Sequence, residues 1–362
     1  MEEWSPGVAM HASQAEAIPG TIPPREAHRF DAARLEAYLR VNVAGFAGPL
    51  AVFQFAGGQS NPTFVLDTPA QRYVLRKKPP GVLLPSAHAV DREYRVITAL
   101  GRTPVPVPRT FCLCEDPSVI GTPFYVMEYV EGRVLRDPTL PGITRSERAA
   151  IYDTMNDVLA RLHRIDPKAL GLEDYGKPGN YFARQIARWT KQYEMSRTED
   201  IPSMTKLLAW LPAHTPPGEE TRLVHGDYRL ENMIFHPREP RVLAVLDWEL
   251  STLGDPLADL AYNCILYHTP GATTAGLMGV DFAATGIPRE ADYLADYCRR
   301  TGRTKIEAWS FYLAFSLFRL AAIAQGILGR ALQGNASSES ARQVGGQARF
   351  LADAAWRMVQ EG

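Results

Sequence analysis

The pattern of residues changes near position 130, and this change restricts the folds that the chain can adopt. Before that position, short runs rich in β-branched and aromatic residues alternate with turn residues, and one helical pattern spans residues 90–100. Beyond it, apolar residues recur mainly at helical spacing. The pattern predicts an α+β, two-lobed fold: a small, mostly antiparallel β N-lobe with one helix, then a larger, mostly helical C-lobe.

The expected elements follow this division. Residues 1–27 are rich in Pro, Ala and Gly without periodicity, so we expect a disordered or loosely packed tail there. The N-lobe is expected over 28–130 and the C-lobe over 131–362. N-lobe strands are expected over 50–55, 63–66, 73–75, 111–114 and 124–129. C-lobe helices are expected over 146–163, 180–194, 203–211, 288–300, 305–330 and 339–360, with two short strands over 233–235 and 242–246.

Composition argues against several classes of protein. The 362 residues include 39 basic and 40 acidic side chains, so the basic excess of a nucleic-acid-binding protein or of a membrane anchor is absent. Four cysteines are too few to indicate a disulfide framework. The N-terminus begins with acidic residues and lacks the basic and apolar regions of a secretory leader. We therefore expect a cytoplasmic protein, with its oligomeric state left open.

One long apolar segment, residues 308–328, raises the question of a membrane span. Arg319 lies in its middle, and Ser316 and Gln325 also interrupt it. A charged side chain at the centre of a bilayer costs roughly 2.5–3.5 kcal/mol even on the lenient insertion scale. We therefore expect a buried helix of the C-lobe and no membrane partner.

Two short segments carry the chemistry. Residues 225–232 read His-Gly-Asp-Tyr-Arg-Leu-Glu-Asn, and Asp247 ends the second of the two short C-lobe strands. Phosphoryl transfer needs a carboxylate near the attacking hydroxyl and hard oxygen ligands that hold Mg²⁺ against the phosphates. Asp227 suits the role of base, and Asn232 and Asp247 suit the role of metal ligands. All three can meet if the two short strands pair as a hairpin.

These segments resemble those of a known family. HGDxxxxN followed by a DW pair is similar to the catalytic loop and metal-binding aspartate of the aminoglycoside phosphotransferase and choline kinase-like family, which are relatives of protein kinases. Residues 254–261 match its GDPxxDLA segment, and residues 73–81 and 92–94 resemble the branch fused to acyl-CoA dehydrogenases. The resemblance covers residues 50–335 and implies a protein-kinase-like fold with ATP and Mg²⁺ as cofactors.

The resemblance also implies a nucleotide-covering loop in the N-lobe. Gly57, Gly58, Ser60 and Asn61 lie between two expected strands. Glycines let the backbone approach phosphates closely, and Ser60 or Asn61 can donate hydrogen bonds to them. An ordinary turn between strands would have the same composition, so the loop gains its meaning from the motifs that follow it.

Further nucleotide contacts are implied on the next strands. Arg76 stands where protein kinases carry a lysine, and Glu93 on the following helix is its expected partner. Arg and Lys bind phosphates with different geometry, so this departure is not neutral. Met127 is expected at the back of an adenine pocket, and the backbone around Glu128 and Tyr129 is expected to bind the adenine edge.

Other polar residues near the motifs have expected structural roles. His225 is expected to hold the loop by packing and hydrogen bonding. Asp255 is expected to brace the loop backbone, and Asp259 is expected at a helix start. His163 is expected to be a satisfied core or surface residue.

The leading function is that of a kinase acting on the hydroxyl of a small molecule. Residues 260–362 show no acidic bias of the kind that a polycationic acceptor would favour. The branch resemblance favours a hydroxylated acyl or acyl-CoA acceptor, as family analogy. A cage for a choline-type acceptor could draw on Tyr262, Tyr267, Trp309, Phe311 and Tyr312, although helical aromatic residues are more often core.

Two alternatives stay open. Arg76 would also suit a nucleotide-binding regulatory module with little transfer activity. A protein kinase is less favoured because no segment ending in Ala-Pro-Glu follows Asp247.

Overall fold

The protein is described by a computed structural model that covers residues 18–57, 61–79, 88–271, 276–332 and 344–361. Its chain divides into two compact units, and the division falls inside one helix. Unit 1 comprises Met1–Tyr94 and Thr110–Tyr129, and unit 2 comprises Arg95–Arg109 and Val130–Gly362. The antiparallel sheet of the first unit and the mostly helical second unit give the α+β fold class expected from the sequence.

Unit 1 is built on a six-stranded antiparallel sheet with the strand order β1-β2-β3-β4-β6-β5. The strands are β1 (Thr21–Ile22), β2 (Ala51–Phe55), β3 (Thr63–Asp67), β4 (Arg72–Lys77), β5 (Thr110–Cys114) and β6 (Phe124–Glu128). The expected N-lobe strands are thus confirmed to within a few residues at their ends. The register places Arg76 opposite Tyr125 and Lys77 opposite Phe124.

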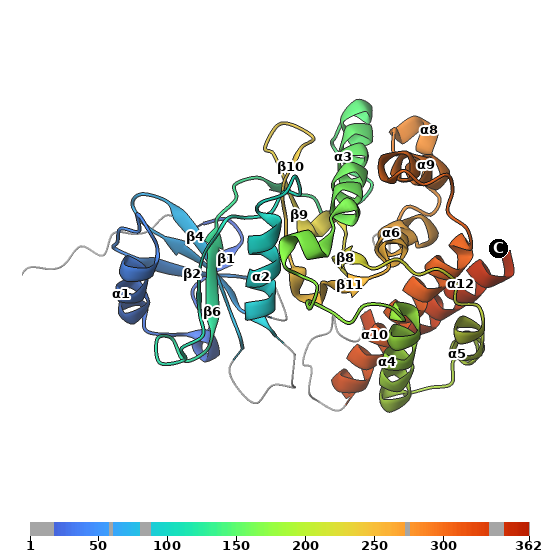
Figure 1. Ribbon diagram of the computed structural model, residues 1–362, viewed down its shortest axis with the longest axis horizontal. Coiled ribbons are helices and arrows are strands. Elements are labelled where there is room, and N and C mark those ends of the chain that lie inside the picture. Colours follow the sequence, from blue (N-terminus) through green and yellow to red (C-terminus); the bar gives the residue numbers. More distant parts are fainter. Residues whose placement is uncertain (1–17, 58–60, 80–87, 272–275, 333–343, 362) are drawn as a thin grey trace, which may run out of the picture. The chain divides into compact units, whose positions relative to one another are not determined.

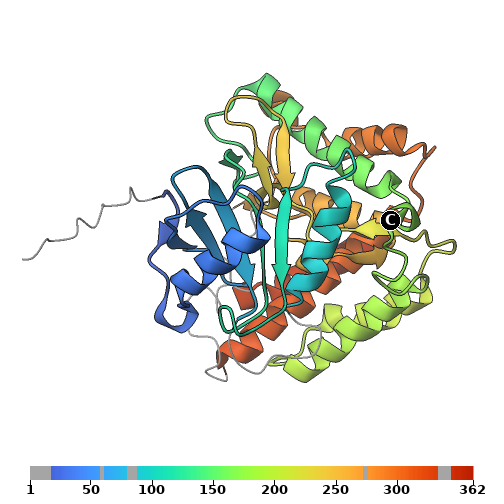
Figure 2. The ribbon, with the colours of Figure 1, turned by 60° about the vertical axis from the view of Figure 1, so that its left-hand side comes forward.

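One face of this sheet carries the apolar core of unit 1. Helix α1 (Ala32–Asn42) begins after Asp31, whose carboxylate accepts the backbone N–H groups of the first turn. Leu35 and Leu39 of α1 pack with Phe64, Leu75 and other buried residues of β3 to β6 (Figures 1 and 2). The 3₁₀ turn η1 (Glu26–His28) precedes α1, and helix α2 (Val90–Leu100) precedes β5.

Part of the segment expected to be a loosely packed tail is instead a strand. Thr21 and Ile22 pair with Phe55 and Gln54 of β2, and Ile18 is buried. A strand of two residues is too short to show alternation, so its sequence carries no periodic signal. Residues 1–17 lie outside the described residues.

Unit 2 consists mainly of helices. They are α3 (Arg145–Arg164), α4 (Tyr181–Ser196), α5 (Pro202–Ala213), α6 (Pro256–Cys264), α8 (Phe282–Thr285), α9 (Glu290–Thr301), α10 (Trp309–Leu332) and α12 (Ala348–Glu361). Four 3₁₀ turns join them in the described part of the chain: η2 (Pro167–Leu170), η3 (Leu230–Asn232), η4 (Trp248–Leu250) and η5 (Ile265–His268). The six expected helices are confirmed, except that residues 339–343 of the last one lie outside the described residues. The short helix α8 was not expected, and for α6 only a helix start at Asp259 was expected.

Two small antiparallel sheets are inserted among these helices. One has the order β10-β9-β7 and the other pairs β11 with β8. Their strands are β7 (Arg133–Val134), β8 (Arg222–Val224), β9 (Met233–Phe235), β10 (Val242–Val245) and β11 (Thr252–Gly254). The loops between these strands contain the motifs found in the sequence.

The long apolar segment is a buried helix of unit 2. Among the described residues, α10 alone has the length and composition to cross a membrane, and 78% of its most apolar window is buried inside the protein. It packs against α12, α4 and α6, and α12 in turn packs against α5 (Figure 1). Its apolar character therefore follows from its central place among helices.

Candidate active site

The hairpin of β9 and β10 brings the two proposed metal ligands to one end of the same small sheet. Met233 pairs with Val245, and the N–H of Leu246 donates to the carbonyl of Asn232 over 2.8 Å. Asn232 directly precedes β9, and Asp247 follows Leu246 after β10. Because the strands are antiparallel, the residue before one and the residue after the other lie at the same end. The hairpin on which the sequence prediction depended is confirmed.

Asp227 is held by hydrogen bonds to both carboxylate oxygens. The Asn232 side-chain N–H₂ group donates to Asp227 Oδ2 and to the Asp227 carbonyl, each over 2.9 Å. The Tyr262 hydroxyl donates to Asp227 Oδ1 over 2.6 Å. Burial and the nearby Asp227 charge raise the pKa of Tyr262, so its hydroxyl stays a donor. The carboxylate is 15% exposed, which leaves it fixed but accessible.

These contacts also fix the orientation of the Asn232 amide. Both partners of its nitrogen are acceptors, so the N–H₂ group must face them and the amide oxygen must face away. No donor to that oxygen is found in the part of the chain that the structure describes. A neutral oxygen with available lone pairs at this position is the kind of ligand that Mg²⁺ accepts.

A buried carboxylate from α6 holds the backbone in front of Asp227. Asp259 accepts the N–H groups of His225 and Gly226 over 2.6 and 2.7 Å, and its other contact is His163 at 3.3 Å. Burial alone would raise the pKa of Asp259, but the hydrogen bonds from the His163 side chain and the His225 backbone outweigh it and lower that pKa. Asp259 therefore acts as an ionised brace of the loop.

The imidazole of His225 closes the loop from inside. Its Nε2 lies 2.9 Å from the carbonyl of Leu246, and its Nδ1 lies 3.2 Å from the N–H of Asp227. A carbonyl can only accept and a backbone N–H can only donate, so the ring is neutral with its proton on Nε2. His225 is fully buried and has the structural role expected from the sequence. His163 is likewise a buried, hydrogen-bonded core residue.

The expected roles of the two aspartates of α6 are exchanged in the structure. Asp255 is the N-cap of α6: its carboxylate accepts the N–H of Leu257 over 2.9 Å and that of Glu220 over 3.1 Å. Asp259, one turn later, braces the loop. The reason is that α6 begins at Pro256, so the residue before it must be the cap. The Asp-Pro pair was the sequence signal that could have assigned it.

The turns around the site use unusual backbone geometry. Gly226 has φ +83°, and a Cβ at that position would lie 2.7 Å from the Leu250 carbonyl oxygen. Asp247 also adopts the left-handed region, at φ 67° and ψ 55°. Glycine adopts this region without strain, whereas a strained non-glycine residue such as Asp247 persists where surrounding contacts impose it, often at functional sites.

Sequence reasoning missed the contact of Tyr262 with Asp227. Asp259 and Tyr262 are three residues apart on α6, so both project from the same side of the helix toward the loop. This spacing was the available signal. Among the described residues, the other candidates for an aromatic cage make different ring contacts: Phe311 and Tyr312 pack against Phe182, Trp309 against Tyr312, and Tyr267 against Phe282 and Tyr293.

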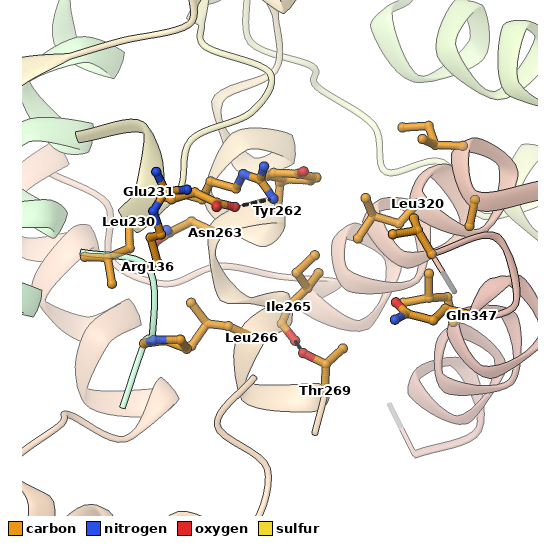
Figure 3. Close-up of a pocket in the computed structure, with 16 residues that line it drawn as sticks. Arg136, Leu230, Glu231, Tyr262, Asn263, Ile265, Leu266, Thr269, Leu320 and Gln347 are labelled. Atoms are coloured by element: carbon orange, nitrogen blue, oxygen red, sulfur yellow. Dashed lines mark hydrogen bonds and ion pairs between the residues drawn. The ribbon is translucent and has the colours of Figure 1, made fainter. Parts of the chain in front are cut away.

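A pocket of about 310 Å³ in unit 2 lies beside Asp227. Tyr262 lines it and links it to Asp227. In Figure 3, Arg136 and Leu266 lie on one side, and Leu320 and Gln347 on the other. Its described lining consists of Arg136, Pro138, Arg229, Leu230, Glu231, Tyr262, Asn263, Ile265, Leu266, Thr269, Leu320, Ile323, Ala324, Val344, Gln347 and Leu351.

Three charged side chains line this pocket: Arg136, Arg229 and Glu231. Glu231 forms an ion pair with Arg229 over 2.7 Å, and the two charges cancel. Arg136 therefore gives the described lining one excess positive charge. Most other lining side chains are aliphatic. The pocket therefore suits a ligand with an apolar body better than a polycation.

Unit 1 brings together two of the residues expected to bind nucleotide. Arg76 Nε lies 3.2 Å from Glu93 Oε2, and the Glu93 side chain is almost fully buried. This is the pair expected from the sequence. Lys77 points to the opposite face, as strand alternation requires, and lies 5.2 Å from the ring centre of Phe30. Burial lowers the pKa of Lys77.

The remaining expected nucleotide residues are placed along the same unit. Met127 is buried in β6, and Glu128 ends that strand with an exposed side chain. Tyr129 follows, with Arg72 over its ring at 5.9 Å. Asn61 is buried, and its amide oxygen lies 3.0 Å from His88 Nδ1. Gly57 has open space around it, because no atom lies within 4 Å of a Cβ built at this position. Gly58 and Ser60 lie outside the described residues.

Within the described ranges, no group of three or more His, Cys, Asp or Glu side chains gathers as a metal site would require. The pair of Asn232 and Asp247 contains a single carboxylate and one amide, so it does not count as such a cluster. Mg²⁺ commonly keeps several waters and takes few protein ligands.

Comparison with known proteins agrees with this geometry. Residues 52–309 match the phosphotransferase enzyme family. The chain belongs to this family. A candidate aminoglycoside phosphotransferase from Ralstonia eutropha has a crystal structure with 55% sequence identity and a TM-score of 0.86, covering 92% of this chain and 99% of the other.

Curated relatives are longer proteins. Acyl-CoA dehydrogenase family member 10 of Mus musculus is 48% identical over 94% of this chain, and the probable acyl-CoA dehydrogenase IBR3 of Arabidopsis thaliana is 47% identical over 91%. The matches cover 32% and 43% of those proteins, so this phosphotransferase-family chain spans less than half of their length.

More distant structures share the fold. A choline kinase from Cryptosporidium parvum is 12% identical with a TM-score of 0.65, covering 91% of this chain and 96% of the other. Aminoglycoside phosphotransferase APH(4)-Ia, in a ternary complex with AMP-PNP and hygromycin B, is 18% identical with a TM-score of 0.59, covering 90% and 99%. These structures therefore share the kinase-like fold of this chain.

Proposed function

We propose that this phosphotransferase-family chain transfers the γ-phosphoryl group of ATP, with Mg²⁺, to a hydroxyl group of a small molecule. The observation that carries the proposal is the fixed carboxylate of Asp227 beside the pocket that Tyr262 lines. Phosphoryl transfer depends mainly on positioning and electrostatics, and this carboxylate is held from both sides.

Asp227 is the proposed base. Its oxygens each keep lone pairs beyond those used by Asn232 and Tyr262, so a hydroxyl can still donate to it. The Asn232 amide oxygen and the Asp247 carboxylate are the proposed Mg²⁺ ligands, and they fit the hard oxygen donors that this ion requires. When bound, Mg²⁺ would neutralise charge on the phosphates.

The N-lobe, over residues 28–130, is proposed to bind the nucleotide. Arg76, held by Glu93, would contact the phosphates, and the loop with Gly57, Gly58, Ser60 and Asn61 would cover them. The backbone around Glu128 and Tyr129 would bind adenine beside Met127. The complex of APH(4)-Ia with AMP-PNP supports nucleotide use by this fold.

The proposed acceptor is a hydroxylated acyl compound, free or as its CoA ester. Leu320, Ile323 and Leu351 line the pocket with aliphatic surface, which an acyl chain would cover. Arg136 supplies the excess positive charge, which would favour an anionic group over a polycationic aminoglycoside. The acyl-CoA dehydrogenase names of the curated relatives support the same class of compound.

A transfer assay with purified protein tests this function. Mg²⁺ and ATP are supplied with separate pools of hydroxyacyl-CoAs, aminoglycosides, choline-like amines and sugars, and phosphorylated products are measured by mass spectrometry. Asp227→Asn keeps the shape of the side chain but removes the base, so kcat should fall by about 10²–10⁴-fold. The KM for ATP should stay within about twofold, because base removal leaves ground-state nucleotide binding in place.

Each outcome has a defined meaning. Transfer to the hydroxyacyl pool that D227N abolishes supports the whole proposal. Transfer to another pool keeps the kinase and overturns the acyl acceptor. Nucleotide binding without transfer to any pool would favour the regulatory module, and loss of nucleotide binding would overturn the kinase.

A further inference from the structure

Arg319 is a buried cation in the middle of the apolar helix α10. Its side chain is 8% exposed, and fifteen of its helix neighbours are buried with it. Within the ranges that the structure describes, no carboxylate lies within ion-pair distance of its guanidinium. Burying a cation without such a partner is costly, so the residue calls for a specific explanation.

The contacts of Arg319 converge on the loop that contains the proposed base. Its Nη2 donates to the carbonyl of Gly226 over 2.7 Å. Its guanidinium carbon lies 5.2 Å from the ring centre of Tyr262 and 5.6 Å from that of Trp189. The cation therefore lies over two aromatic rings while it donates to the loop backbone.

Two of these contacts, one with the loop and one with α6, lead directly to Asp227. Gly226 precedes Asp227 in the chain and has the left-handed backbone that sets the direction of the next peptide. Tyr262 donates its hydroxyl to Asp227 Oδ1 over 2.6 Å. Arg319 thus holds Gly226 through a hydrogen bond and Tyr262 through the contact with its aromatic ring, and both of these residues adjoin the proposed base.

We propose that Arg319 is a positioning residue for Asp227 that sets the orientation of its carboxylate through Gly226 and Tyr262. The proposal rests on the proposed function of Asp227 as base. A Leu or Met at this position would match the apolar helix, but neither side chain could donate to the Gly226 carbonyl. That carbonyl would then be left without this donor in a buried position.

The first test measures the loop itself and needs no acceptor. Amide hydrogen exchange is followed by mass spectrometry in peptides covering residues 222–232 for the wild type, Arg319→Met and Arg330→Met. Arg330 is an exposed arginine of the same helix and serves as the matched control. R319M should speed exchange in these peptides by roughly tenfold or more, and R330M should not.

The second test separates turnover from binding, with the hydroxyacyl-CoA pool and ATP as substrates. R319M should lower kcat by roughly 10–100-fold, with the KM for ATP within about twofold of the wild type. Arg319→Lys, which keeps a cation and a donor, should recover part of kcat. Tyr262→Phe should lower kcat by about tenfold, and the double variant should be no slower than R319M, because both act through one carboxylate.

Several results would overturn the proposal. A role of Arg319 in positioning the loop requires R319M and R330M to differ, so equal exchange or equal kcat in the two variants contradicts the proposal. Additive effects of R319M and Y262F also contradict a shared route. If R319M does not fold, R319K and Y262F take its place, and their loop exchange and kcat are compared with those of R330M. Faster loop exchange in R319M together with absent transfer in the wild type would support the positioning role and overturn the proposed function separately.

Discussion

The loop that carries Asp227 and the adjoining pocket of unit 2 are built in different ways. The loop draws its key groups from residues 225–247, and its polar atoms are held by hydrogen bonds of 2.6 to 3.2 Å. The pocket draws its lining from segments as distant in the chain as Arg136 and Leu351, and most of its walls are aliphatic. One site is fixed by directional bonds over a short stretch, and the other by packing over a long one.

This difference has a consequence for function. Hydrogen bonds fix atoms to within fractions of an ångström, which phosphoryl transfer requires. Aliphatic walls are non-directional and accept ligands of similar shape, which permits acceptors to vary. Helix α6 serves both sites, because Asp259 braces the loop and Tyr262 and Asn263 line the pocket. The comparison predicts that changes in the loop affect kcat and changes in the pocket affect acceptor binding.

The largest expected effect comes from Gly226→Ala. A left-handed alanine and the approach of its Cβ to the Leu250 carbonyl together should lower the free energy of unfolding by about 2–4 kcal/mol. Displacement of Asp227 should lower kcat by roughly 10²-fold. Urea denaturation and the transfer assay measure the two effects.

Gly121→Ala is the matched control for this change. Gly121 has φ +88°, but nothing lies within 4 Å of its hypothetical Cβ. The Gly121→Ala variant should lose only about 1–2 kcal/mol of its free energy of unfolding, because only the left-handed backbone is strained, and it should retain kcat. Equal losses of unfolding free energy and of kcat in the two variants would show that the close approach of the Leu250 carbonyl to Gly226 does not matter.

The next effect concerns the pocket. Leu320→Glu places a charge on its aliphatic wall, and the lost apolar contact of about 1.5–3 kcal/mol should weaken acyl binding by roughly 10–100-fold. Binding of hydroxydodecanoyl-CoA is measured by calorimetry, and kcat at saturating acceptor should change little. Leu332→Glu, at a position of the same helix that is 61% exposed, is the control and should bind normally. Equal weakening by both variants would contradict acyl binding in this pocket.

The sequence predicted the sheet of unit 1 and the hairpin beside the loop well, because both depend on short-range patterns. Alternation in β4 placed Arg76 and Lys77 on opposite faces, and the pairing of Arg76 with Glu93 followed. The interval between Asp227 and Asn232 fits one loop, and the short strands around it form the hairpin.

What the sequence did not reveal depends on burial and on distant segments. All nine residues of α6 are buried, so the helix has no solvent-exposed face that would mark it as a surface helix. The exchange of roles between Asp255 and Asp259 followed from placing the start of this helix at Asp259 rather than at Pro256. Arg319 looked only like an argument against a membrane span, because its contacts with Gly226 and Tyr262 join residues far apart in the chain.

The smallest expected effect is a pH dependence at the start of α6, and it tests whether this helix supports both sites. Burial, as the main cause, raises the pKa of Asp255 from 3.8 to about 6. Between these values the folded chain holds a proton that the unfolded chain releases, so the stability that Asp255 contributes falls as pH rises. Two pKa units correspond to at most about 3 kcal/mol, and partial access of water to the group reduces this to about 1–2 kcal/mol.

Asp255→Asn removes the titration and keeps one oxygen to accept the N–H of Leu257. The difference in unfolding free energy between D255N and the wild type should therefore shift in favour of D255N by about 1–2 kcal/mol from pH 4 to pH 7. Urea denaturation across this range measures the shift. A constant difference would contradict the raised pKa. Because D255N leaves Asp259 and Tyr262 in place, kcat and acyl binding at neutral pH should both persist; loss of one alone would show that α6 positions the loop and the pocket independently.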